Sequence, residues 1–368
     1  MQIRRNHRRG IGATVDGPGV SASAARAAQA RGATSRWSAA RASSRSNATR
    51  VRGAARVRAP ARRIVAALAL CAAAAVQPCR EAHADEGGAS FWVPGQSAAN
   101  LAASAPSPGW SLPVTYYYYS GSAPGNASEG GAVAPGTRSW TSQLAFSPTY
   151  VPAATVLGGQ LALTVSFGVE GNATRLTPTN PSGPARETVW GLTDVVPAAT
   201  LGWQRGPDSW AAYLMGNLPV GSYDSQRLSN TGLGRAALDA GIIGSYDSPS
   251  SGRSASVAVG VTYNFTNPDT DYRSGVDAHL GASAMVPLTP SLRAGLSGYV
   301  YYQLTADGGR GNGCGPCKSR VAGIGPQVNY AFDVAGREWS ANLRGYYEFW
   351  ARNRLQGGAL FASLAIPL

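Results

Sequence analysis

The segment Ser254 to Phe265, SASVAVGVTYNF, changes between apolar and small or polar residues at every second position. In an extended chain, Val257, Val259 and Val261 lie on one face and Thr262 lies on the other. This period of two indicates a β-strand, because successive side chains of a strand point to opposite sides of the sheet. The apolar face must be buried, either in a protein core or in lipid.

About a dozen segments with this pattern follow one another from Ser111 to Leu368. Only 14% of all residues are charged, whereas a soluble β-sandwich carries abundant charge on its polar face. Some connections are tight and others, such as 170–190, 220–235 and 305–319, are long and rich in Gly, Pro, Asn and Ser. An even strand number with such connections is typical of bacterial outer-membrane barrels. The predicted strands are 111–120, 139–150, 158–169, 192–204, 209–219, 236–247, 253–265, 273–287, 291–304, 320–333, 338–351 and 357–368.

The fold class expected for residues 111–368 is therefore all-β, a closed antiparallel transmembrane β-barrel of about 12 strands. Closure is required because lipid offers no partner to the backbone groups of an open sheet edge, so segment 357–368 is expected to pair with the first strand. Aromatic residues near the strand ends are consistent with girdles at both bilayer interfaces. These residues are Trp140, Tyr150, Trp203, Trp210, Tyr246, Tyr263, Trp339 and Trp350.

The net charge of +13 suggests a nucleic-acid partner until the charges are placed along the chain. Of the 32 basic residues, sixteen lie in residues 1–84 with only two acidic residues, so residues 85–368 carry 16 basic and 17 acidic groups. The part that folds is thus nearly neutral, and no nucleic-acid partner is predicted. Competing interpretations of the basic leader are an organellar transit peptide and an RNA-binding arm.

The leader has the features of a secretory signal. Arg62 and Arg63 precede an apolar run from Ile64 to Val76, which is shorter than the ~20 residues that a membrane-spanning helix needs. Ala82-His83-Ala84 then gives an A-x-A cleavage pattern, and we expect cleavage after Ala84. Residues 64–84 are the predicted signal-peptide region. Residues 1–63, rich in Arg and Ala and predicted to be disordered, are either a long export leader or the result of a start codon assigned too far upstream.

Residues 85–110 lack alternation and are rich in Gly, Pro, Ala and Ser. We expect an irregular N-terminal segment that folds back as a plug, with Phe91 and Trp92 contacting the lumen. Cys314 and Cys317, in a CGPC sequence within a Gly-rich loop, are the cysteines that remain after cleavage. A loop disulfide or unpaired thiols are favoured over redox chemistry, which would need a βαβ setting, and over zinc, which would need further ligands.

The strand faces opposite the apolar ones would line the lumen. Tyrosine rings there could stack with a flat, weakly polar solute, Arg344 could steer its hydroxyl or carboxylate, and the four-residue spacing allows Arg344 to pair with Glu348. Arg293 and Asp277 are expected to be neighbours on adjacent hairpins. The alternative is a packed lumen in which charged side chains stabilise a narrow barrel. The candidate solute path comprises Asp277, His279, Arg293, Tyr299, Tyr301, Asn342, Arg344, Tyr346 and Glu348.

An enzyme is the less favoured interpretation. His279 is the only histidine after the predicted cleavage site, and an outer-membrane hydrolase would need a serine close to it. Ser283 lies on the same strand face, but ~3.3 Å of rise per residue places it ~13 Å away. There is no phosphate loop, no metal-ligand cluster and no catalytic carboxylate pair in the sequence, so no cofactor and no metal are expected.

Several stretches resemble an outer-membrane transporter family associated with the meta-pathway of phenol degradation. They are Glu86 to Gly95 (EGGASFWVPG), Leu218 to Asp224 (LPVGSYD), Gly260 to Asp271 (GVTYNFTNPDTD), Arg320 to Gln327 (RVAGIGPQ) and Gly345 to Phe349 (GYYEF). The resemblance covers essentially all of residues 85–368. It implies an outer-membrane transporter for phenolic or other hydrophobic compounds. The CGPC insertion and the long leader depart from the family pattern.

We therefore predict a Gram-negative outer-membrane channel for passive passage of small hydrophobic or aromatic, phenol-like compounds. Its expected partners are the outer-membrane bilayer, the solute, and the export and barrel-assembly machinery. The alternatives are a structural or adhesin-like barrel without transport and, less favoured, an outer-membrane hydrolase.

Overall fold

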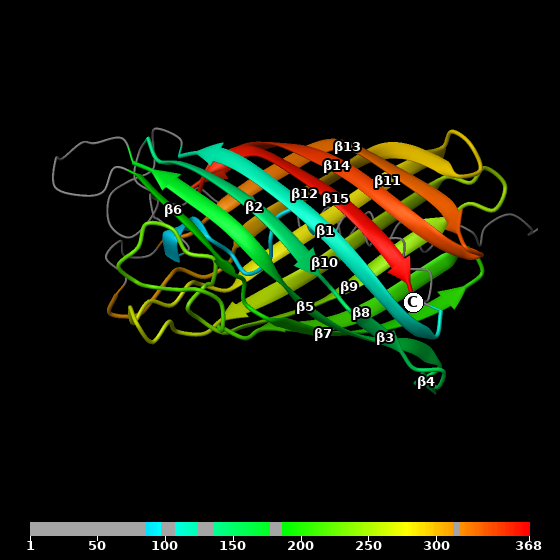
Figure 1. Cartoon of the computed structure of the whole chain (residues 1–368), viewed down its shortest axis with the longest axis horizontal. Coiled ribbons are helices and arrows are strands. Elements are labelled where there is room, and N and C mark those ends of the chain that lie inside the picture. The colour runs from blue at the N-terminus through cyan, green and yellow to red at the C-terminus, as the bar shows by residue number, and fades with distance from the viewer. Residues whose placement is uncertain (1–85, 97–106, 124–135, 177–185, 312–316) are drawn as a thin grey trace, which may run out of the picture. The chain divides into compact units, whose positions relative to one another are not determined.

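The computed structural model describes residues 86–96, 107–123, 136–176, 186–311 and 317–368. All of them belong to one compact unit, residues 78–368. The described elements are one short 3₁₀ helix, η1 (Glu86–Gly88), and fifteen strands of a single sheet. Twelve of these strands form the wall of a barrel (Figure 1). They are β1 (Gly109–Ser122), β2 (Arg138–Phe146), β5 (Gly159–Arg175), β7 (Val196–Arg205), β8 (Asp208–Asn217), β9 (Ala237–Asp247), β10 (Ser254–Asn264), β11 (Asp277–Pro287), β12 (Leu292–Gln303), β13 (Arg320–Val334), β14 (Arg337–Arg352) and β15 (Gln356–Pro367).

The barrel closes between its first and last strands. β1 pairs antiparallel with β15, from Ser111 opposite Pro367 to Ser122 opposite Gln356, and the two lie side by side in Figure 1. Every other neighbouring pair along the wall is antiparallel as well. Each of the twelve wall strands is therefore paired on both sides, as a lipid environment requires. The predicted closed barrel of twelve antiparallel strands is confirmed.

Two predicted strands are interrupted in the structure. Segment 139–150 divides into β2 and β3 (Thr149–Val151), with Pro148 between them; proline has no N–H to donate to the ladder. Segment 192–204 forms β7 only from Val196 onward, and β6 (Arg186–Leu192) occupies residues that were predicted to belong mostly to the connection 170–190; both strands pair with β5. At this break the buried carboxylate of Asp194 accepts hydrogen bonds from the backbone N–H of Gly221 (2.8 Å) and Leu233 (2.9 Å). β4 (Thr155–Val156) forms a small hairpin with β5.

The alternating residues 254–264 form β10, and its orientation shows which face points into the barrel. Val259, Val261 and Tyr263 are exposed on the outside of the barrel, whereas Thr262 and Asn264 are buried inside it, each at most 1% exposed. Aliphatic side chains exposed around a closed sheet are the arrangement that lipid favours and water disfavours. The apolar face therefore forms the outer surface of the barrel.

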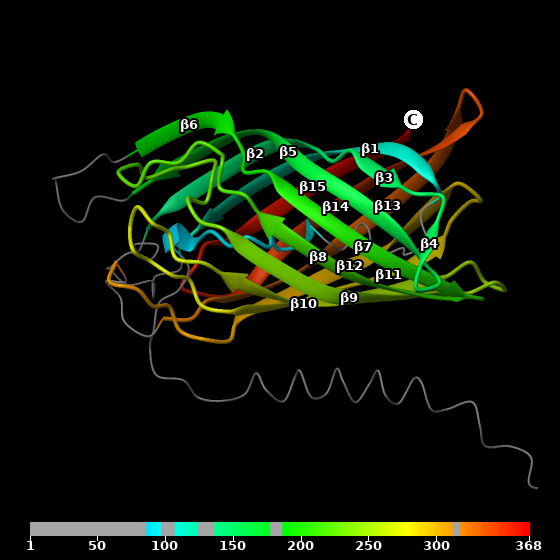
Figure 2. The ribbon, with the colours of Figure 1, turned by 90° about the horizontal axis from the view of Figure 1, so that it is seen from below.

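The connections define two ends of the barrel, which are visible in Figure 2. The long-loop end carries connections 123–137, 176–185, 218–236, 265–276 and 304–319, and the short-turn end carries 152–158, 206–207, 248–253, 288–291 and 335–336. Trp210 and Tyr246 are exposed near the short-turn end, and Tyr263 and Trp350 near the long-loop end. These two bands fit interfacial girdles. None of the helical structure in the described residues is long and apolar enough to cross a membrane; that finding does not concern β-barrels.

Candidate functional site

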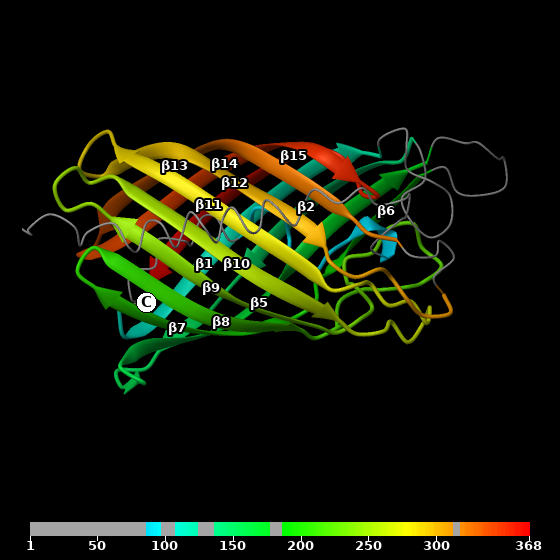
Figure 3. The same ribbon diagram turned by 180° about the vertical axis from the view of Figure 1, so that it is seen from behind.

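Residues 86–96 lie inside the ring of wall strands, where Figure 3 shows them behind β10 and β11. Phe91 is 6% exposed and Trp92 1% exposed. In the sequence, this segment has no alternation that would let it join the sheet, so its Phe and Trp are buried by packing against inward-facing side chains of the wall. Three groups of contacts hold the segment: an aromatic platform, an arginine bridge and a carboxylate cluster.

The aromatic platform is formed by His279 of β11 and by Tyr299 and Tyr301 of β12. The indole ring of Trp92 stacks on the His279 imidazole, with ring centroids 4.2 Å apart and planes 12° apart. It is nearly parallel to the Tyr301 ring at 6.5 Å, and its contact with Tyr299, at 6.3 Å, is edge-to-face. Such aromatic pairs add to the stabilisation that comes from burial alone. The platform is therefore an aromatic surface inside the barrel that the Trp92 indole covers.

The arginine bridge joins β14 to the backbone of the segment. The Arg344 guanidinium donates from Nε to the carbonyl oxygen of Gly95 (3.1 Å) and from Nη2 to that of Gln96 (2.9 Å). A third bond, from Nη1, goes to Asn342 Oδ1 (2.7 Å), and the guanidinium carbon lies 4.3 Å from the centre of the Phe361 ring. Arg344 is buried, so these bonds replace its lost hydration.

The predicted Arg344–Glu348 ion pair is wrong. In the described structure, the Glu348 carboxylate accepts hydrogen bonds from the hydroxyls of Tyr119 (2.9 Å) and Tyr299 (2.8 Å) and from the backbone N–H of Gly357 (2.8 Å). The two residues share a strand face, but each is hydrogen-bonded to other groups, and a four-residue separation along a strand is too long for direct contact.

Gly95 has a backbone conformation that other residues rarely adopt, and its Cα is closely surrounded. Its φ is +88°, and a Cβ atom added to it would lie 2.7 Å from the Tyr346 ring. We expect Gly95→Ala to weaken docking of the segment, since overpacking commonly costs about 1–3 kcal/mol. The measurement is single-channel conductance in planar bilayers, where the variant should be open for longer. Gly87→Ala is the matched control, because Gly87 also has positive φ (+66°) but no atom within 4 Å of the added Cβ. Equal behaviour of the two variants would contradict the steric explanation.

The carboxylate cluster surrounds Glu86 at the long-loop end. Its carboxylate accepts hydrogen bonds from Asn267 Nδ2 (3.0 Å to each oxygen), Thr270 Oγ1 (2.6 Å) and the Tyr223 hydroxyl (3.4 Å), and Arg235 Nη1 lies 3.7 Å away. Burial, reinforced by the negative charge of Glu86, raises the pKa of Tyr223 above its usual value. The phenol therefore stays protonated at neutral pH and can donate.

This cluster was not among the sequence-predicted site residues. One feature of the sequence nevertheless marked it: Glu86, Tyr223, Asn267 and Thr270 all lie in stretches that carried the family resemblance. Those stretches are far apart in the chain and meet around residues 86–96. Tyr346 of the GYYEF stretch also contacts this segment, through a hydrogen bond from its hydroxyl to the carbonyl oxygen of Gly95 (3.4 Å).

His279 is engaged in a buried polar cluster. Its Nε2 lies 2.8 Å from Asp239 Oδ2, which also accepts a hydrogen bond from the Thr262 hydroxyl. The hydroxyl of Ser283 is instead bonded to Ser256 (2.8 Å). The structure thus does not join His279 to the serine that the hydrolase interpretation considered.

The remaining predicted residues are distributed over the barrel. Asp277 is 1% exposed and accepts a hydrogen bond from Asn264 Nδ2 (2.8 Å) near the long-loop end. Arg293 lies at the short-turn end, where it pairs with Asp247 (3.3 Å), so the expectation that it neighbours Asp277 is wrong. The reason is that Asp277 begins β11 and Arg293 follows the turn at its other end.

Cys317 is fully buried, whereas Cys314 lies outside the described residues, so the loop disulfide stays a prediction. Among the described residues, no group of three or more His, Cys, Asp or Glu is arranged to hold a metal ion.

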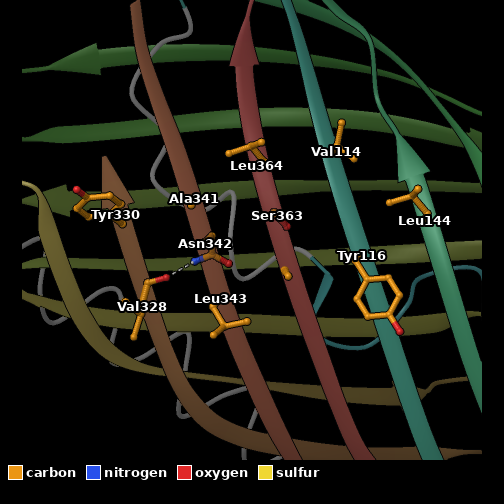
Figure 4. Close-up of a pocket in the computed structure, with 11 residues that line it drawn as sticks. Val114, Tyr116, Leu144, Val328, Tyr330, Ala341, Asn342, Leu343, Ser363 and Leu364 are labelled. Carbon is orange, nitrogen blue, oxygen red and sulfur yellow. Dashed lines mark hydrogen bonds between the residues drawn. The ribbon is translucent and has the colours of Figure 1, made fainter. Parts of the chain in front are cut away.

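A shallow apolar groove runs along the outer wall over β13, β14, β15, β1 and β2 (Figure 4). Tyr116, Leu343 and Leu364 line it, and the Asn342 amide donates to the carbonyl oxygen of Val328 beneath it (3.3 Å). Tyr116 and Leu343 are exposed on the same face as the girdles. The groove therefore belongs to the lipid-facing surface and is separate from the interior site.

Comparison with known proteins gives a family and a fold. The model of a family described as "Putative MetA-pathway of phenol degradation" matches residues 121–364. The crystal structure of the COG4313 outer membrane channel from Pseudomonas putida F1 is similar over 75% of this chain and 100% of that one, with 14% identity and a TM-score of 0.58. The translocator domain of the autotransporter NalP from Neisseria meningitidis has 11% identity and a TM-score of 0.41 over 74% and 93% of the two chains. No curated protein sequence is detectably similar.

Proposed function

The chain belongs to the family of the MetA pathway of phenol degradation, and from that premise we propose that it is an outer-membrane channel for passive passage of small hydrophobic or aromatic compounds. In this proposal, residues 86–96 are a plug that closes the lumen at rest, and solutes pass along the aromatic platform when the plug moves. The signal region directs export and is cleaved after Ala84, and the export and barrel-assembly machinery delivers and inserts the chain.

The observation that carries the proposal is the position of Trp92. A fully buried indole lies on an aromatic platform in the interior of a barrel whose outside is apolar. Apart from the ring contacts of Trp92, the segment is held by a small number of hydrogen bonds, which the wall and loops donate to its backbone carbonyls and to the Glu86 carboxylate. Each of these hydrogen bonds can be broken and replaced separately. A covalent or sheet-like attachment would not allow such movement.

The candidate path residues fit this role. Tyr299, Tyr301 and Tyr346 present rings, and Arg344 and His279 present hydrogen-bond donors and flat faces. Buried Phe361 and Val321 add apolar surface to the same cluster. A phenol-like solute combines a flat ring with one hydroxyl, and this lining complements both parts. We assign no catalytic step to any of these residues.

The experiment compares cells and liposomes with and without the protein. Uptake of a panel of aromatic compounds by cells should be faster when the protein is present, and a variant lacking residues 86–96 should leak ions and sugars through liposomes as well. The wild-type protein should leak neither. If deletion leaves liposome leakage unchanged, the segment is not a plug; if uptake of every compound is the same without the protein, the transport proposal fails.

The second candidate is a barrel with a structural role only. The observation in its favour is the packing of the interior, where Tyr301 is 0% and Trp92 1% exposed. This candidate predicts no uptake difference and the same low conductance in the wild-type protein and in every plug variant.

A further inference from the structure

The surroundings of Glu86 have the composition of a binding site for a carboxylate. Five side chains from two neighbouring loops of the long-loop end converge on this residue. Asn267, Thr270 and Tyr223 donate hydrogen bonds to its carboxylate, Arg235 supplies a positive charge, and Ser274 Oγ accepts from its backbone N–H (3.4 Å). Charge-assisted hydrogen bonds of this kind are stronger than neutral ones. The arrangement is more elaborate than one surface carboxylate needs.

The buried Arg235 side chain requires a negatively charged partner in this site. Its side chain is 1% exposed, and Glu86 is the acidic residue with which it forms an ion pair in the described structure. Its other bonds go to neutral oxygens, the carbonyl of Ala89 (2.8 Å) and Asn264 Oδ1 (3.5 Å). A buried guanidinium is strongly disfavoured without a counter-charge. If residues 86–96 leave the lumen, Arg235 loses both Glu86 and the Ala89 carbonyl, and the vacated site then favours a new anion.

We propose that the long-loop mouth of the barrel contains a carboxylate-binding site, occupied at rest by Glu86, at which small aromatic carboxylates compete and so release the plug. One part of this inference rests on the proposed function: that release of the plug opens a path for solutes through the barrel. The site itself depends only on the geometry around Glu86. A solute carboxylate can replace that of Glu86, and a ring suits the aromatic platform that the solute meets further inside the barrel, so aromatic acids are the class of ligand that the site favours.

The first test measures binding directly, with benzoate as the probe and benzyl alcohol as its neutral counterpart of similar size. Isothermal titration of the protein in detergent should show benzoate binding at least about tenfold more tightly to Glu86→Ala than to the wild-type protein, because a tethered carboxylate competes at an effective concentration in the millimolar range. Benzyl alcohol should not distinguish the two. Asp224→Ala removes another acidic residue of the same loops, one that is exposed and paired with Arg227, and should behave as wild type.

Two further variants identify the site. Asn267→Ala and Thr270→Val, each combined with Glu86→Ala, should reduce benzoate affinity at least about tenfold relative to Glu86→Ala alone. Both double variants should remain folded, which is checked by the resistance of the barrel to unfolding in electrophoresis detergent without heating. Arg235→Gln serves the same purpose if it folds. Equal benzoate affinity in wild-type and Glu86→Ala protein, or binding of benzyl alcohol to Glu86→Ala that is as tight as that of benzoate, would overturn the proposal.

The second test measures release of the plug. Benzoate added at the long-loop side of a planar bilayer should lengthen openings of the wild-type protein and have no such effect on Glu86→Ala, which should already open more often. Failure of the transport proposal is distinguishable: uptake would be absent, yet titration would still show the benzoate site. Failure of the present inference would leave uptake of neutral aromatics intact and remove the difference between benzoate and benzyl alcohol.

Discussion

Trp92→Ala is expected to increase the open time of the channel by up to about a hundredfold. Removal of a buried Trp side chain typically costs about 3–5 kcal/mol, and about 3 kcal/mol corresponds to a hundredfold change in an equilibrium. Here that free energy is lost by the docked state alone, because in the undocked state the indole has already left His279 and Tyr301. The substitution therefore changes the equilibrium between the docked and undocked states of residues 86–96 more than it changes the stability of the barrel wall.

The measurement is single-channel recording in planar bilayers. Trp110→Ala is the matched control, because Trp110 is 55% exposed on the outer surface at the short-turn end and contacts Tyr150 instead of the plug. It should retain wild-type open times. If both variants conduct like the wild-type protein, stacking on His279 does not keep the barrel closed. Thermal unfolding of the barrel followed in parallel separates loss of the plug from loss of the wall.

Leu296→Arg is expected to destabilise the barrel in a bilayer by about 2–4 kcal/mol, since an arginine on the lipid face near the bilayer midplane costs that much. Leu296 lies near the middle of β12 and is 58% exposed. If the outer face met water instead of acyl chains, the same substitution at an exposed position would have almost no effect.

The control is Leu288→Arg, at a similarly exposed residue (60%) in the short-turn connection after β11. Near the interface the cost falls to about 0–1 kcal/mol. Urea unfolding in lipid vesicles, with the midpoint compared among wild type and the two variants, gives the result. Equal midpoints for Leu296→Arg and Leu288→Arg would mean that depth in a membrane has no influence, and the transmembrane interpretation would be wrong.

The wall of the barrel was predictable because its determinants are local. The alternation of residues 254–265 and of the other segments sets strand direction and face, since the side-chain period of a strand is two. Observed and predicted strand ends differ by few residues for most strands; β10, predicted as 253–265, spans Ser254–Asn264. The breaks at Pro148 and Asp194 were missed, because Asp194 is stabilised there by backbone groups from the distant loop 218–236.

The interior was predictable only in part. Periodicity placed Tyr299, Arg344 and Glu348 on the inward face, but it could not select their partners. Which inward residues face each other depends on the number and stagger of strands around a closed barrel, and this is why periodicity did not predict that Arg344 bonds to Gly95 and Gln96. The family resemblance pointed to the right stretches without stating that they meet.

By itself, the sequence determined that the chain forms alternating strands with one apolar face, that these must close on themselves in lipid, and that a nonalternating segment precedes them. Only the tertiary structure decided where that segment lies and what holds it, because the contacts of Glu86, Trp92 and Gly95 come from strands and loops more than a hundred residues away. Period-two alternation acts between neighbours in the chain, whereas packing across a lumen acts between neighbours in space.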